Sequence, residues 1–129
     1  IYDIASNCDT ILTVSGTVTL QIALTGTPMA ILYKMSPMTY AIGKRLVKVA
    51  HASLPNIVAS KRIVPEFIQE KATPQALADE ALHVLSDTDY ANAMKEELRL
   101  VQKQLGEPGC SKRVAAMLLD MLEKNKTQL

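Results

Sequence analysis

The turn formed by Ser15, Gly16 and Thr17 carries the residues whose types and spacing best suit chemistry in this sequence. A short β-branched run, residues 10–14, ends at this turn, and a segment with helical spacing begins directly after it. Backbone N–H groups at the start of a helix are unpaired and carry the positive end of the helix dipole, so they can bind an anion such as a diphosphate. Gly16 would permit a close approach of that ligand. The alternative is an ordinary strand-to-helix turn with Ser or Thr as N-cap.

Other common catalytic motifs are not found in the sequence. The patterns G-x-G-x-x-G and G-x-x-x-x-G-K-[ST] do not occur, so the fingerprints of a dinucleotide dehydrogenase and of a P-loop nucleotide hydrolase are lacking. His51 and His83 have no nucleophile or metal-binding partner at useful spacing, and we expect structural or surface roles for both. Cys8 and Cys110 belong to no Cys/His cluster, which argues against a disulfide framework and a zinc site and fits a reducing cytoplasm.

The elements that would position the turn alternate between strand and helix. Residues 10–14 and 29–33 read as buried strands, and helices are expected over residues 17–24, closed by Gly26 as C-cap, and from Pro37 to about residue 48. With or without a short third strand near residues 52–54, this order predicts a parallel α/β sheet. A complete doubly wound sheet has about five or six strands, and the chain opens at Ile1 in what reads as the end of an element. We therefore expect a part of a longer protein.

The second half of the chain is predicted to be helical. Thr73, followed by proline, should cap a helix that runs to about residue 85, and Asp87 or Asp89 should cap a second helix that ends at Gly106. Ser111 should begin a last helix, whose apolar face comprises Val114, Leu118, Met121 and Leu122. We accordingly divide the chain into an α/β part, residues 1–72, and a helical tail, residues 73–129.

The composition limits the class of partner. The 129 residues, 48% hydrophobic and 21% charged, are enough for one globular domain with an appendage. Lys and Arg number 14 against 13 Asp and Glu, so the net charge of +1 provides no broad cationic surface for nucleic acid. Aromatic residues are 4% with no Trp, which argues against stacking platforms for single-stranded nucleic acid. No apolar run reaches the roughly 18 to 20 residues of a membrane span.

Five short motifs follow one another in order along the first half of the chain. They are SGTVTL at residues 15–20, GTPM at 26–29, YKMSP at 33–37, KRLVK at 44–48 and SLPN at 53–56. In this order they resemble the C-terminal part of the lipid-A-disaccharide synthase family. The resemblance extends from about residue 8 to about residue 82 and weakens over the last two helices. The combination of S-G-T-x-T-L with S-L-P-N is more specific than either motif alone.

The resemblance implies a fold and a reaction. The fold would be the C-terminal Rossmann-like half of a GT-B glycosyltransferase with a helical C-terminal tail, and its partner would be the N-terminal half of the enzyme. The family transfers 2,3-diacylglucosamine from UDP-2,3-diacylglucosamine to 2,3-diacylglucosamine 1-phosphate and releases UDP. We expect no cofactor and no metal, because transferases of this architecture stabilise the leaving diphosphate with helix dipoles and basic side chains. The catalytic residue would belong to the N-terminal half, so none is assigned.

The resemblance also assigns binding residues. Ser15, Gly16 and Thr17 would lie at the diphosphate, and Asn56 would contact the nucleotide sugar. The residue at position 21 would face the ribose, and there the family usually has Glu whereas this chain has Gln21. A carboxylate can accept from two hydroxyl groups, while a carboxamide accepts at its oxygen and donates at its nitrogen. The substitution therefore predicts a weaker hold on the ribose.

Two further polar residues are candidates. Lys34 directly follows the second strand, at the edge where open α/β folds bind ligands; an exposed lysine without a ligand is the alternative. Gln69 ends a PEFIQ stretch that the family shares, and either contacts the sugar nucleotide or makes a hydrogen bond at a helix end. A basic cluster is either a solvated face or a patch for an anionic membrane surface or an acyl-sugar 1-phosphate. The cluster comprises Lys44, Arg45, Lys48, Lys61 and Arg62.

Alternatives of other classes stay open. One is a non-catalytic binding or assembly module whose helical tail makes oligomer contacts, and another is half of a sugar-nucleotide epimerase, which shares the two-domain architecture but lacks the S-L-P-N combination. A homodimer through the tail is one expected partnership, and nucleic acid is not an expected partner. The expected location is the cytoplasm, with peripheral contact to the inner face of the inner membrane as an open possibility.

Overall fold

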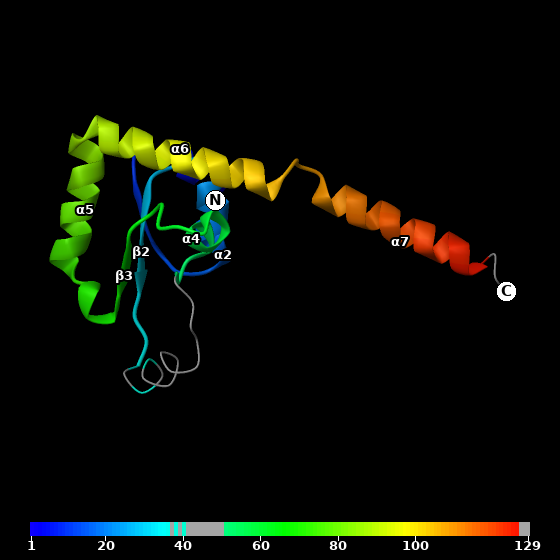
Figure 1. The fold of residues 1–129 in the computed structure, drawn as a ribbon, viewed down its shortest axis with the longest axis horizontal. Helices are drawn as coiled ribbons and strands as arrows, with labels where there is room; N and C mark the ends of the chain where they lie inside the picture. The colour runs from blue at the N-terminus through cyan, green and yellow to red at the C-terminus, as the bar shows by residue number, and fades with distance from the viewer. Residues whose placement is uncertain (37, 39, 41–50, 127–129) are drawn as a thin grey trace.

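Three parallel strands form the sheet at the centre of the molecule (Figure 1). The computed structural model describes residues 1–36, 38, 40 and 51–126. Its strands are β1 (Ile11–Val14), β2 (Met29–Tyr33) and β3 (Glu66–Ile68), with β2 in the middle. The parallel α/β sheet predicted from the sequence is therefore confirmed, and its first two strands match the predicted runs to within one residue.

The burial of each strand follows from its place in the sheet. The central strand β2 begins with three buried apolar residues in a row, Met29, Ala30 and Ile31. The edge strand β1 alternates between half-buried and exposed residues. A central parallel strand is covered on both faces and so has a continuous apolar run, whereas an edge strand has one face that is less covered.

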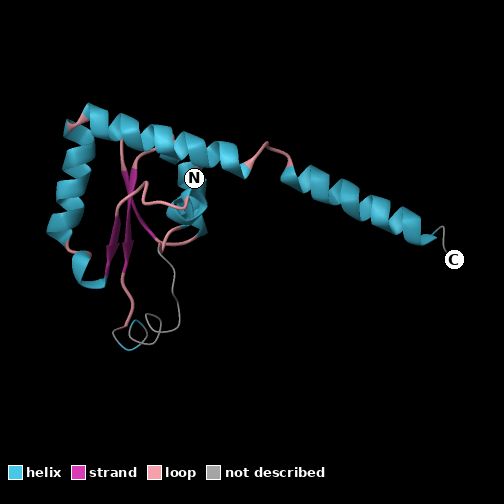
Figure 2. Cartoon of the chain, in the orientation of Figure 1, coloured by secondary structure: helices cyan, strands magenta, loops and turns pink. Residues whose placement is uncertain are grey.

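Helices cover both faces of the sheet and one of its ends (Figure 2). The short helices α2 (Thr17–Ala23) and α4 (Leu54–Ala59) lie side by side on one face, and α5 (Pro74–Ser86) lies on the other. Helix α6 (Thr88–Leu105) crosses the end of the sheet at which the strands begin and packs against α2, α4 and α5. The carboxyl ends of the strands are thus left uncovered by α6.

Helix α6 supplies the centre of the hydrophobic core. Its buried residues, Ala91, Met94, Leu98 and Val101, recur at intervals of three and four, which puts them on one face of the helix. They pack in one cluster with residues of β2, α2 and the loop before β3. Gln102 also donates from Nε2 to the backbone oxygens of Ala23 and Leu24, each at 3.1 Å, and so joins α6 to the end of α2.

The predicted helix boundaries in the second half are largely confirmed. The Thr73 hydroxyl accepts from the N–H of Ala76 at 3.2 Å, and the Asp87 carboxylate accepts from the N–H of Tyr90 at 2.9 Å, so both act as N-caps. Of the two candidates for the second cap, the structure selects Asp87. Gly106 ends α6 with a φ of 79°, a value that favours glycine.

Two local predictions are wrong. Gly26 is not the C-cap of α2, because the helix ends at Ala23 with Leu24 as C-cap, and Gly26 stands in the following turn with a φ of 73°. Residues 52–54 form no strand: a bend at residues 52–53 leads into α4, and the third strand is β3 instead. The helix predicted from Pro37 to about residue 48 falls mostly outside the described residues.

The last helix, α7 (Cys110–Lys126), extends away from the rest of the molecule (Figure 1). It begins one residue before the predicted Ser111. Its predicted apolar face is exposed, with Val114 at 48% and Leu118 at 56% of their full exposure. Helices α5 and α6 instead contribute to the same core as the sheet. The division of the chain between residues 72 and 73 stays a prediction.

Truncation of the central α6 side chain should strongly destabilise the fold. Leu98 is fully buried, so Leu98→Ala should lower the free energy of unfolding by about 2–5 kcal/mol through lost burial and the cavity left behind. Leu100→Ala, two residues away on the same helix but at a position 48% exposed, is the matched control and should cost less than about 1 kcal/mol. Urea denaturation followed by circular dichroism would measure both, and similar losses for the two variants would contradict this account of the core.

Candidate functional site

The carboxyl edge of the sheet gathers most of the predicted site residues. Because the strands are parallel, their carboxyl ends meet at one edge, where open α/β folds bind ligands. Ser15 follows β1, Lys34 follows β2 and Gln69 follows β3. The sequence predicted the first two placements from strand boundaries, whereas the third depends on a strand that was not predicted there.

Three hydrogen bonds fix the turn after β1 and the start of α2. The N–H of Ser15 donates to the carbonyl of Leu32 at 3.3 Å, extending the pairing with β2 by one step. The Ser15 hydroxyl donates to the carbonyl of Ala52 at 2.7 Å. Within α2, the hydroxyl of Thr19 donates to the carbonyl of Gly16 at 2.6 Å. The start of α2 is therefore fixed to β2 and to the segment before α4.

Gly16, the N-cap of α2, stands beside open space. A Cβ atom added there would meet nothing within 4 Å, and its φ of 162° is extended backbone that any residue adopts. Neither packing nor backbone conformation within the described residues requires glycine at this position. The open space fits the predicted close approach of a ligand to Gly16, and both Gly16 and Thr17 are exposed.

Asn56 is buried inside the protein and is not exposed at the surface of the site. The residue is fully buried at the start of α4. Its Oδ1 accepts from the N–H groups of Ile63 at 2.8 Å and Val64 at 3.0 Å, and its Nδ2 donates to the carbonyl of Val64 at 2.9 Å and to Glu66 Oε1 at 2.8 Å. All the hydrogen-bonding capacity of the amide is thus used inside the protein. Its predicted contact with a nucleotide sugar stays a prediction.

Glu66 is the residue that sequence reasoning missed. Its carboxylate accepts from four donors, three on the segment before α4 and one on α4 itself: the N–H of Ala52 at 3.2 Å, the N–H of Ser53 at 2.9 Å, the Ser53 hydroxyl at 2.5 Å and the Asn56 amide. A signal was present, because Glu66 is a single charge within the apolar run of residues 63–68. A charge in such a run implies dedicated hydrogen-bond partners.

These donors alter the acidity of the carboxyl group. Burial by itself would raise the pKa of Glu66, but hydrogen bonds from Ser53, Ala52 and Asn56 together outweigh that effect and lower the pKa below its usual value of 4.5. Glu66 is therefore ionised at neutral pH, and its negative charge is shared among donors of the protein.

Gln69 links the loops that follow β2 and β3. Its Oε1 accepts from the N–H of Met35 at 2.8 Å, and its Nε2 donates to the Met35 carbonyl at 3.1 Å. The residue is buried and has a φ of 53°, in the left-handed region that is unfavourable for residues other than glycine. The paired bonds to Met35 hold this conformation. Lys34, one residue before Met35, is exposed.

Gln21 lies on the exposed surface of α2, one turn after Thr17. Residues four apart on a helix share a face, so Gln21 continues the line that begins at the turn. The structure thus puts Gln21 on the same side of α2 as Thr17. Its predicted contact with a ribose stays a prediction.

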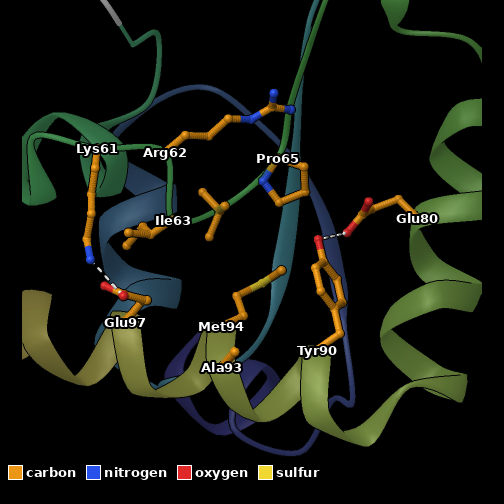
Figure 3. A pocket seen from close by; sticks show the side chains of 10 residues that line it. Lys61, Arg62, Ile63, Pro65, Glu80, Tyr90, Ala93, Met94 and Glu97 are labelled. Atoms are coloured by element: carbon orange, nitrogen blue, oxygen red, sulfur yellow. Dashed lines mark hydrogen bonds and ion pairs between the residues drawn. The ribbon is translucent and has the colours of Figure 1, made fainter.

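The hollow drawn in Figure 3 lies away from this edge. It has a volume of about 380 Å³ between α6 and the loop before β3, at the end where the strands begin. Two polar pairs line it: Lys61 bonds to Glu97 at 2.7 Å, and the Tyr90 hydroxyl donates to Glu80 at 2.8 Å. Burial and the neighbouring Glu80 raise the pKa of Tyr90 to about 12. Of the predicted residues that the structure describes, Lys61 and Arg62 of the basic cluster line this hollow.

Other predicted features are partly outside the described residues. Lys44, Arg45 and Lys48 of the basic cluster lie outside the described residues. Over residues 1–36, 38, 40 and 51–126, no group of three or more His, Cys, Asp and Glu side chains is arranged to hold a metal ion. Over the same residues, no helix has the length and apolar character needed to span a membrane.

Loss of the Glu66 charge should destabilise the fold in a pH-dependent way. At neutral pH, Glu66→Gln should lower the free energy of unfolding by about 1–2 kcal/mol, because charge-assisted hydrogen bonds are lost and an amide NH₂ would face N–H donors. Since the pKa of Glu66 is lowered by folding, its contribution is present above the usual value of 4.5 and is lost as the pH falls through the lowered pKa.

Urea denaturation of the wild type and of Glu66→Gln from about pH 7 to about pH 3 would measure the difference in their free energies of unfolding. This difference should be constant above about pH 5 and shrink in acid. The exposed Glu70→Gln, four residues away, is the matched control and should show little change. Equal stability of wild type and Glu66→Gln at neutral pH, or a difference that grows in acid, would contradict the assigned role.

Comparison with known proteins gives a consistent result. The family model described as Lipid-A-disaccharide synthetase matches residues 1–119. The relative from Syntrophotalea carbinolica is 51% identical over 121 residues, which is 94% of this chain and 31% of the relative. The relative from Geobacter sulfurreducens is 51% identical over 124 residues, which is 96% of this chain and 32% of the relative.

A third relative, from Geobacter metallireducens, is 48% identical over 126 residues, which is 98% of this chain and 33% of the relative. All three relatives are named Lipid-A-disaccharide synthase. The chain therefore spans about a third of the length of the curated relatives it matches. On the extent of the family match and the level of identity, the chain belongs to the lipid-A-disaccharide synthetase family.

Proposed function

We propose that this chain is the nucleotide-sugar-binding part of a glycosyltransferase of the GT-B type. The complete enzyme would transfer 2,3-diacylglucosamine from UDP-2,3-diacylglucosamine to 2,3-diacylglucosamine 1-phosphate, forming the disaccharide 1-phosphate and UDP. The chain itself would bind UDP without turnover, because closure of a second domain normally completes the site of such a transferase. The names of the relatives and the parallel α/β sheet support the proposal.

One contact carries the proposal furthest. Ser15, the first residue of the S-G-T turn, and Ala52, the residue directly before S-L-P-N, are 37 positions apart in the sequence. The Ser15 hydroxyl joins them by donating to the Ala52 carbonyl at 2.7 Å. The two motifs whose combination is specific to the family thus belong to one place at the carboxyl edge. Helices α2 and α4 begin side by side there.

Each exposed residue at this edge has a proposed role. The backbone at Gly16 and Thr17 would meet the diphosphate in the open space beside Gly16. Gln21 would face the ribose from the next turn of α2. Lys34, exposed after β2, would offset the negative charge of the diphosphate.

The buried residues would act from behind the ligand. Asn56 and Gln69 use their side-chain amides to bond the protein itself, so we propose that they shape the loops that contact the nucleotide sugar. The donor half would comprise residues 1–72, with residues 73–129 as its helical tail. Peripheral contact with the inner face of the inner membrane, and a second copy bound through the tail, stay predictions.

A non-catalytic assembly module is the rival of a different class. The exposed apolar side chains of α7 are the observation in its favour, because exposed apolar patches commonly mark protein contacts. The open turn at Gly16 favours the transferase instead, since an assembly module has no need of space there. An epimerase half, the other alternative, has no observation of its own in its favour.

The test of the proposed function is binding of UDP to this chain. Ligand-observed NMR should show weak binding of UDP and no sugar transfer by the isolated chain. Gly16→Val is a sharp control, because its side chain would enter open space and leave the fold intact while it blocks the approach of the diphosphate. Retained UDP binding in folded Gly16→Val would exclude the diphosphate from this turn, and transfer by the isolated chain would contradict the need for a second domain.

A second prediction concerns the ribose. If the side chain at position 21 meets the ribose hydroxyls, Gln21→Glu should tighten UDP binding by about 1 kcal/mol, the difference between a neutral and a charge-assisted hydrogen bond. The gain should vanish for the 2′,3′-dideoxy analogue of UDP, which separates the hydrogen bonds from the repulsion between a carboxylate and the diphosphate. Titration of both ligands against both proteins is the measurement, and an equal change for the two ligands would show that position 21 is away from the ribose.

A further inference from the structure

Ala52 is bonded on both sides to parts of the molecule that are far apart in sequence. Its N–H donates to both carboxylate oxygens of Glu66 at 3.2 Å, and its carbonyl accepts from the Ser15 hydroxyl at 2.7 Å. Glu66 is on β3 and Ser15 is at the end of β1, the two edge strands of the sheet. A continuous chain of hydrogen bonds therefore runs from Glu66 through Ala52 to the turn at Ser15.

The direction of these bonds determines what Ser15 can do. A carbonyl oxygen only accepts, so the single hydroxyl proton of Ser15 is donated to Ala52. The Ser15 side chain consequently has no proton left to donate to a phosphate oxygen. Its role in the structure is to fix the turn on which Gly16 and Thr17 stand.

Glu66 in turn fixes Ala52. Its carboxylate accepts from two consecutive backbone N–H groups, those of Ala52 and Ser53, and from the Ser53 hydroxyl and the Asn56 amide. A carboxylate has only acceptor sites, which suits four converging donors, whereas a carboxamide would direct an NH₂ at some of them. The position of the Ala52 carbonyl, and with it that of Ser15, thus depends on the charge of Glu66.

We infer that Glu66 is a positioning residue of the candidate site, acting through Ala52 and Ser15 to fix the turn that meets the diphosphate of the ligand. The inference rests on the proposed function and adds a residue that the family resemblance did not assign. Glu66 contacts no ligand in this scheme. Its effect should therefore be confined to the part of the ligand that the turn meets.

The experiment compares UDP with uridine on the 129-residue chain. Glu66→Gln should weaken UDP binding by about five- to tenfold, the equivalent of one disturbed hydrogen bond, and leave uridine binding within about twofold of the wild type. General loosening of the fold would instead weaken both ligands together. Glu70→Gln removes the same charge from a nearby exposed position and should leave both affinities unchanged.

A double-mutant cycle then tests the route from Glu66 to the turn. Ser15→Ala should weaken UDP binding to a similar extent. The double variant Ser15→Ala, Glu66→Gln should bind UDP about as well as whichever single variant binds it less tightly, because both changes break the same chain of hydrogen bonds. Amide correlation spectra would establish that each variant is folded. If Glu66→Gln does not fold, Glu66→Asp, which keeps the charge but shortens the side chain, takes its place in the cycle.

The outcomes separate the two proposals. If the wild-type chain binds no UDP, the proposed function fails, and this inference fails with it. If the wild type binds UDP, the positioning role of Glu66 alone is overturned when Glu66→Gln binds UDP as tightly as the wild type, or when it loses affinity for UDP and uridine to the same degree. That role is also overturned when the effects of Glu66→Gln and Ser15→Ala on UDP affinity multiply in the double variant.

Discussion

The hydrogen bonds that converge on the carboxylate of Glu66 hold the edge of the sheet on which the site depends. They join the start of β3 to the segment that leads into α4, and through Ala52 that segment is joined to the turn after β1. The site is therefore assembled by polar contacts between three segments, not by the hydrophobic core. A half-buried charge is stable in this place because four groups of the protein donate to it.

The core and the site occupy opposite ends of the sheet. Helix α6 closes the end where the strands begin, with Met94, Leu98 and Val101 fully buried. The carboxyl end is bounded by turns whose backbone groups are held by the side chains of Ser15 and Gln69. The exposed backbone and polar groups of the carboxyl end are thus separate from the apolar side chains that α6 buries.

The local elements could be predicted because their causes are local. The apolar run of residues 29–33 is a strand in the structure, and Thr73 and Asp87 cap helices as their types suggested. The strand β3 was missed because its three residues are too few for a periodicity, and its pairing with β2 is a long-range event. The alternative third strand at residues 52–54 is absent for a related reason: the N–H groups of Ala52 and Ser53 bond to the carboxylate of Glu66 in place of a neighbouring strand.

The sequence by itself determined the parallel α/β class, the helical second half, the turn at residues 15–17 and the resemblance to a family to which the chain belongs. These follow from spacing, capping residues and motif order, all of which are properties of neighbouring residues. Only the tertiary structure decided what Asn56 and Glu66 do. A buried amide and a lone carboxylate acquire their roles from donors and acceptors that folding brings to them from other segments, and no spacing along the chain specifies which of those groups will meet.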